Sequence, residues 1–165
     1  MAICLVGRAL DKALLSDAMA SLALPWSRQV NNVVDHFIGW VPWARRTQIV
    51  LHQGDKVVEY AGVYLFADFG KSAPKTGVSY EDDAIFYVGE TGRSFGKRWY
   101  EYERTNWFRG VFGKAPGRVW VAALPTRIGP GQTTPEPLTT QFRLYTERRI
   151  IWEHAMKGHY LRNVR

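Results

Sequence analysis

Two tyrosines stand at similar positions in consecutive strand-like segments of this 165-residue sequence. Alternation of side chains along a strand places Val63 and Leu65 on the opposite face from Tyr64, and Phe86 and Val88 opposite Tyr87. Pairing of the two strands would therefore bring both phenols to one face. Aromatic cross-strand pairs are also ordinary sheet packing, so the tyrosines alone do not define a site.

Other residue types needed for chemistry on a phosphate follow further along the chain. Arg98 and Tyr102 are four residues apart, so they share one face of the helix expected after the second strand. Glu147 is a lone carboxylate among arginines in the last helical segment, and Asn163 lies near the end. One carboxylate, one guanidinium and several phenols can support metal-assisted attack on a phosphodiester. Taken singly, Arg98 could be a surface cation, Glu147 an ion-pair partner of its neighbouring arginines, and Asn163 a C-terminal cap.

The charge of the chain is concentrated in its second half. The formal net charge is +7, and 15 of the 22 cationic side chains are arginines. Residues 1–90 carry 8 basic and 10 acidic side chains, whereas residues 91–165 carry 14 basic and 5 acidic ones. Because the planar guanidinium matches phosphate oxygens in pairs, this distribution favours a nucleic-acid partner over a general role in solubility.

Several classes of protein do not fit the sequence. A single cysteine, Cys4, rules out an internal disulfide and a zinc site built on cysteine pairs. Glycine-rich phosphate loops and a pair of histidines at helical i, i+4 spacing are absent. Charges interrupt the first 15 residues, and no apolar run is long enough to span a bilayer. We therefore expect a cytoplasmic protein, nucleoid-associated if bacterial, with no membrane partner.

The pattern of elements divides the chain near residue 60. In residues 1–60 we expect an N-terminal helical extension plus a hairpin: helices at 3–24 and 28–40, and strands at 47–51 and 56–60 around a Gly-Asp turn. In residues 61–165 we expect strands at 62–69, 84–89 and 118–124, and helices at 95–108, capped by Ser94, and 138–156. This order predicts an α+β fold with a small central, mainly antiparallel three-stranded sheet flanked by helices.

Because of the order of these residues, the chain from about 62 to 165 resembles the GIY-YIG endonucleases. The first motif is matched by Gly62-Val63-Tyr64 and the second by Tyr87-Val88-Gly89, with valine in place of isoleucine in both. Arg98, Tyr102, Glu147 and Asn163 follow in the order of the family's remaining site residues. The joint order and spacing are far more specific than either tripeptide.

The resemblance implies a divalent-metal-dependent DNA endonuclease with one Mg²⁺ or Mn²⁺ per active site. Glu147 would be the metal ligand, and Arg98 would neutralise charge in the transition state. Tyr64 would be the general base or the residue that positions the attacking water, helped by Tyr87 and Tyr102, with Asn163 supporting the site. A base role requires a cation that favours phenolate, because a free tyrosine has a pKa near 10.

Some assignments remain open in the sequence. Arg93 is an alternative to Arg98 as the catalytic arginine, but Tyr102 on the same helix face favours Arg98. Glu153 is an alternative to Glu147 as the metal ligand, but the Ile150-Ile151 pair that follows favours Glu147. Candidate DNA contacts are Arg93, Lys97, Arg104, Arg109, Arg148 and Arg149. Double-stranded DNA is the expected partner, and a homodimer is possible. The alternative is a catalytically inactive nucleic-acid-binding module of the same fold.

Overall fold

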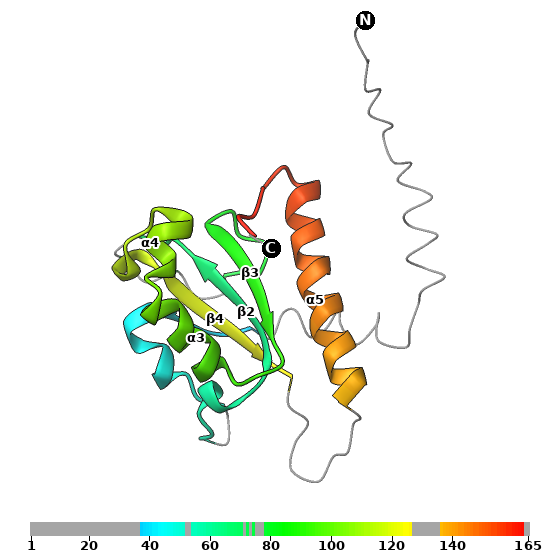
Figure 1. Ribbon diagram of the computed structural model, residues 1–165. Coiled ribbons are helices and arrows are strands. Elements are labelled where there is room, and N and C mark those ends of the chain that lie inside the picture. Colours follow the sequence, from blue (N-terminus) through cyan, green and yellow to red (C-terminus); the bar gives the residue numbers. More distant parts are fainter. Residues whose placement is uncertain are drawn as a thin grey trace, which may run out of the picture.

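The computed structural model describes residues 37–51, 54–70, 72, 74, 78–126 and 136–163. The predicted helix at 3–24, most of that at 28–40 and the loop at 127–135 lie outside these residues. The described part is an α+β fold with a four-stranded antiparallel sheet and a C-terminal helix packed on it. In Figure 1 the sheet stands between that helix, α5, and a second helical layer.

The strand order of the sheet is β1-β4-β2-β3. Its strands are β1 (Ile38–Pro42), β2 (Gly62–Ala67), β3 (Ile85–Thr91) and β4 (Trp120–Pro125). The three strands predicted in residues 61–165 are present, with ends shifted by a few residues. β2 is central and pairs with both β3 and β4, which leaves β3 at one edge of this sheet.

The prediction of a three-stranded sheet is wrong by one strand. Residues 38–40, expected at the end of a helix, belong to β1, which pairs with β4. The backbone explains the difference, because Gly39 has a φ of 118° and Trp40 a φ of 41°. Neither value is compatible with a right-handed helix, and together they form the irregularity in the register of β1.

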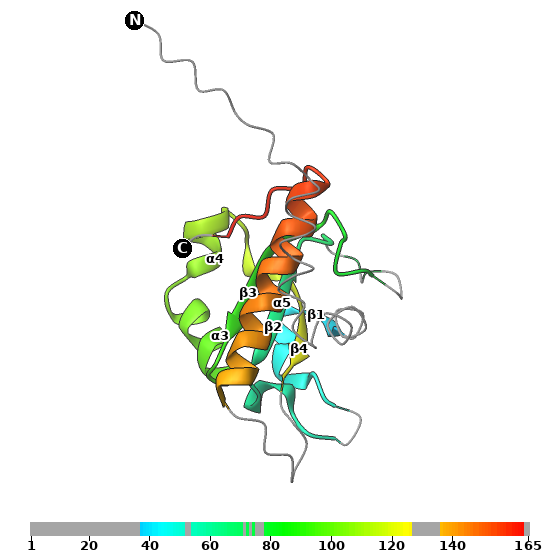
Figure 2. The same cartoon turned by 90° about the vertical axis from the view of Figure 1, so that its right-hand side faces the viewer.

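Every residue of β2 is buried, because helices cover both faces of the strand. Tyr64 and Phe66 pack in one apolar cluster with the helices α3 (Phe95–Arg104) and α4 (Trp107–Phe112). Val63, Leu65 and Ala67 pack in a second cluster with α5 (Glu136–Met156). Figure 2 shows α5 lying across its side of the sheet. The two clusters are the two halves of the core.

The helix predicted at 95–108 is divided into α3 and α4. Ser94 caps α3 as expected, since its hydroxyl accepts a hydrogen bond from the amide of Lys97. The helix ends because Asn106 adopts the left-handed conformation, with a φ of 50°. The break turns the chain so that Trp107 and Phe108 pack against the cluster that contains Tyr64.

The hairpin predicted before residue 60 is reduced to one bridge, between Val50 and Lys56. Its expected strands are replaced by the 3-10 helices Trp43–Gln48 and Val57–Glu59. These short helices bury Trp43 and Val57 in the core, which an exposed two-stranded ribbon would not do.

Within the described residues, none of the helices has the length and apolar character of a membrane span.

One prediction about strand alternation is wrong. Phe86, expected on the opposite face from Tyr87, packs beside it in the same cluster, and its ring lies 4.8 Å from that of Phe112. The register of β2 and β3 shifts where Phe66 pairs with Tyr87 and Ala67 pairs with Ile85. A β-bulge of this kind turns one extra side chain toward the same face.

Candidate functional site

Three tyrosine rings gather between the sheet and α3. Tyr64 from β2 lies 6.2 Å from both Tyr87 of β3 and Tyr102 of α3, measured between ring centroids. The hydroxyls of Tyr64 and Tyr102 are hydrogen-bonded to each other. All three side chains are buried. We call Tyr64, Tyr87 and Tyr102 the phenol cluster.

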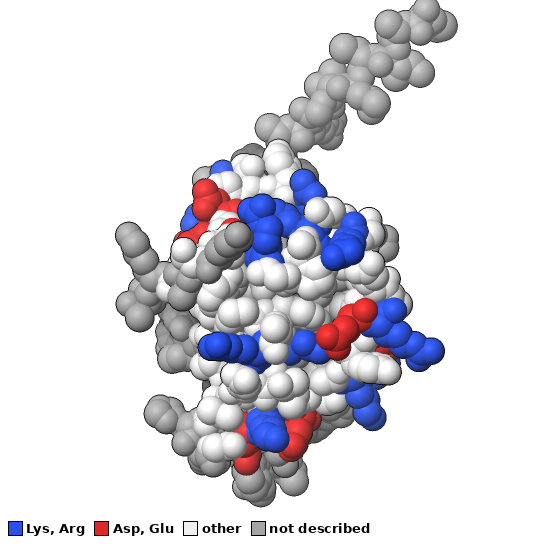
Figure 3. All heavy atoms as spheres, turned by 90° about the vertical axis from the view of Figure 1, so that its left-hand side faces the viewer, with Lys and Arg blue, Asp and Glu red and all other residues white. Residues whose placement is uncertain are grey.

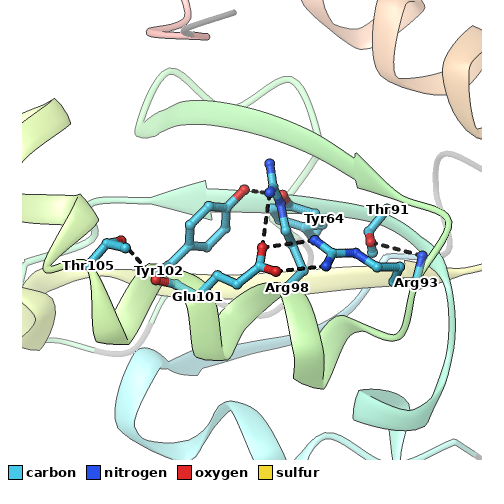
Figure 4. A network of polar contacts seen from close by, with 7 residues as sticks. All are labelled: Tyr64, Thr91, Arg93, Arg98, Glu101, Tyr102 and Thr105. Carbon is cyan, nitrogen blue, oxygen red and sulfur yellow. Dashed lines mark hydrogen bonds and ion pairs between the residues drawn. The ribbon is translucent and has the colours of Figure 1, made fainter.

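Arg98 lies over the phenol cluster at the solvent side. Its guanidinium carbon is 4.9 Å from the centroid of the Tyr102 ring, and its proximity to the Tyr64 hydroxyl lowers the pKa of that hydroxyl. Trp107 also contacts Tyr102, because the two rings are stacked with their centroids 4.1 Å apart. Arg98 and Tyr102 thus share one face of α3, as their spacing predicts. Figure 4 shows Arg98 beside Tyr64 and Tyr102.

Electrostatics favour neutral phenols beneath a charged guanidinium. Burial raises the pKa of the Tyr64 hydroxyl well above its usual value, and Tyr102 and Tyr87 raise it further. Burial and Tyr102 likewise raise the pKa of Tyr87. Burial alone would lower the pKa of Arg98, but its proximity to Tyr64 and Tyr102 raises it. Of the two roles considered for Tyr64, these directions favour positioning by a neutral hydroxyl over action as a phenolate base.

Gly89 provides the space that the Tyr64 side chain occupies. Tyr64 and Gly89 are cross-strand partners, and a Cβ atom at Gly89 would lie 2.5 Å from Cζ of Tyr64 and 2.6 Å from its hydroxyl. Gly62 is equally confined, since a Cβ there would lie 2.2 Å from the Leu124 carbonyl oxygen. The two glycines of the matched motifs therefore have physical roles in seating the first tyrosine.

Gly89→Ala should displace the Tyr64 ring and destabilise the protein by about 1–3 kcal/mol, the usual cost of overpacking a core. The matched control is Gly110→Ala in α4, where an added Cβ meets no atom within 4 Å. Alanine is the better helix former, so the control should leave stability unchanged or raise it. Urea unfolding of both variants measures the difference. Equal stability of the two variants would show that Tyr64 is not seated as described.

Glu147 reaches the sheet from the other layer. It lies on the buried stripe of α5, together with Arg143, Ile150 and His154, and is only 6% exposed. α5 packs mainly against β3, the strand that carries Tyr87 and Gly89. Charged side chains are rarely buried without a partner or a function. The guanidinium of Arg98 and the carboxylate of Glu147 thus come from helices in the two layers on opposite sides of the sheet.

The competing residues have different surroundings. Arg93 is 56% exposed and pairs with Glu101, whereas Arg98 lies on the phenol cluster. Glu153 is paired with Arg149 at 2.8 Å, one turn away on the same helix. This geometry favours Arg98 over Arg93 as the cation of the cluster. Glu147 is the more buried of the two carboxylates.

Asn163 binds the free edge of β3. Its Oδ1 accepts a hydrogen bond of 3.1 Å from the Val88 amide, and its Nδ2 donates one of 2.6 Å to the Val88 carbonyl. The amide of Arg162 also donates to the Phe86 carbonyl at 2.8 Å. The C-terminal segment thereby satisfies backbone groups of an edge strand and fixes the residues on either side of Val88. This placement is that of a supporting residue.

The donor set fits a hard cation only in part. Among the described residues, no three His, Cys, Asp or Glu side chains gather as a ready-made metal site. Glu147 supplies one carboxylate, a suitable oxygen ligand for Mg²⁺ or Mn²⁺. A cation held this way needs water and a substrate phosphate to complete its shell, so its affinity for the protein alone should be low.

Most of the candidate DNA-binding side chains are exposed. Lys97, Arg104, Arg109 and Arg148 lie at the surface and, within the described part of the chain, form no ion pair with a carboxylate. Arg149 differs, since its pairing with Glu153 leaves it 17% exposed. On the face that carries α3 and α4, Lys and Arg outnumber Asp and Glu (Figure 3).

Two residues of the site are missed by the sequence reasoning. Glu101 pairs with Arg98 three residues earlier on α3, a spacing that could have indicated the contact. Trp107 follows the break after α3, and nothing local indicates that its ring stacks on Tyr102.

No protein-family model matches the sequence, and neither the curated proteins nor the solved structures contain a match.

Proposed function

We propose that the chain is a divalent-metal-dependent DNA endonuclease that hydrolyses phosphodiester bonds with a GIY-YIG-type site. The observation that carries the proposal is the phenol cluster under Arg98 at the edge strand β3. Phenylalanine would fill this space without hydroxyls that need partners, so three tyrosines meeting one guanidinium exceed what packing requires.

The roles follow from the positions of the side chains. Arg98, 36% exposed, can meet a phosphate from solvent while its other contacts hold it on Tyr102 and Glu101. A preorganised cation at this point would stabilise the charge that develops on the phosphoryl oxygens. The neutral Tyr64 hydroxyl would orient the attacking water. The metal, held by Glu147, would polarise the phosphate when bound.

The basic second half of the chain supports DNA as the substrate. Arginines and lysines beside the cluster can contact phosphates on either side of the scissile bond without reading sequence. A binding module that has lost catalysis is the second candidate. It is favoured by the raised pKa values of the buried Tyr64 and Tyr87, but it leaves the alignment of Arg98 over the Tyr102 ring without a purpose.

Incubation of the protein with supercoiled plasmid in Mg²⁺, Mn²⁺ or EDTA tests the proposal. We expect nicked or linear plasmid with either metal and intact plasmid in EDTA. Filter binding of the same plasmid across a salt series accompanies the assay, because phosphate contacts make affinity fall steeply with salt. Salt-sensitive binding without cleavage would favour the binding module, and absence of binding would contradict a nucleic-acid substrate.

A further inference from the structure

An ion network lies at the solvent side of the phenol cluster. Both carboxylate oxygens of Glu101 face the fork of Arg93, with contacts of 2.7 Å to Nη1 and 2.9 Å to Nη2. One of these oxygens, Oε2, also accepts from Nη1 of Arg98 at 3.2 Å. One carboxylate therefore holds two guanidiniums side by side (Figure 4).

The arrangement is open to solvent. The side chains of Arg93, Arg98 and Glu101 are 56%, 36% and 41% exposed. Exposed ion pairs contribute little to stability, so the fold does not depend on this network. Two guanidiniums on a pair of oxygens is also the geometry in which arginines bind the non-bridging oxygens of a phosphate.

We propose that Glu101 occupies a two-arginine seat for a backbone phosphate in the free protein, and that bound DNA displaces it. This inference rests on the proposed function, which supplies the phosphodiester ligand. In the free protein the carboxylate keeps Arg93 and Arg98 adjacent despite their like charge. On binding, a phosphate takes over both guanidiniums, and the Glu101 side chain turns to solvent.

Glu101→Gln tests the proposal against the matched variant Glu103→Gln. Glu103 lies on the same helix, is 54% exposed and pairs with Arg46 at 2.6 Å. Both changes remove one charge, with two ion pairs lost at Glu101 and one at Glu103. The readout is the affinity for a fluorescein-labelled DNA duplex in EDTA, measured by anisotropy. We expect Glu101→Gln to bind about three- to tenfold tighter than wild type, the size that competing exposed pairs give. Glu103→Gln should stay within about twofold.

Arg93→Ala, made in wild type and in Glu101→Gln, completes the test. If Glu101 competes with phosphate for Arg93, the loss of affinity should be larger in the Glu101→Gln background. Equal gains for Glu101→Gln and Glu103→Gln, or equal losses for Arg93→Ala in both backgrounds, would overturn the inference and leave the proposed function intact. Failure of every variant to bind the duplex would overturn both.

Discussion

Arg98→Ala should lower the rate of DNA cleavage by about 10²–10³-fold, the effect of removing one preorganised group that stabilises transition-state charge. The guanidinium is held at this position by Tyr102 and Glu101, whereas Arg93, its neighbour on Glu101, is 56% exposed. Stability should change little, because Arg98 is partly exposed and the hydrogen bond between Tyr64 and Tyr102 remains. Initial rates of plasmid nicking measure the effect.

The control for this prediction is Arg45→Ala. Arg45 is exposed in the 3-10 helix Trp43–Gln48 and, among the described residues, has no ion-pair partner. The change removes the same charge without touching the phenol cluster, so cleavage should stay within a few-fold of wild type. Equal cleavage by the two variants would mean that Arg98 acts only through the net charge of the protein.

Glu147→Gln should lower cleavage by about 10³-fold or more while DNA binding persists. The substitution keeps the size of the side chain but removes the charge that a divalent cation requires, and metal stabilisation of a phosphoryl group contributes several kcal/mol. Binding should persist because the phosphate contacts come from arginines and lysines elsewhere on the surface.

The strands that carry the tyrosines could be predicted from the sequence, because β2, β3 and β4 are rich in aromatic and β-branched residues. Alternation along β2 and β3 also places Tyr64 and Tyr87 on one face, as observed. Prediction failed where single residues take unusual backbone angles. Trp40 at a φ of 41° turns an expected helix into β1, and Asn106 at a φ of 50° divides an expected helix into α3 and α4.

The candidate site was predictable where it depends on spacing and unpredictable where it depends on tertiary packing. The interval of four residues between Arg98 and Tyr102 indicates that they share a helix face. That interval cannot show that Glu101 bridges two guanidiniums, since this depends on the rotamers of three long side chains. The burial of Glu147 against the sheet is equally hidden, because a lone carboxylate among arginines is typical of an exposed helix face.

The most direct test of the account is plasmid cleavage in Mg²⁺ by wild type, Glu147→Gln and Glu153→Gln at saturating protein. Both glutamates lie on α5, but Glu147 is 6% exposed against the sheet and Glu153 is paired with Arg149. We expect wild type and Glu153→Gln to cut at similar rates and Glu147→Gln to leave the plasmid supercoiled. Cleavage by Glu147→Gln at the rate of wild type would contradict the proposed endonuclease site.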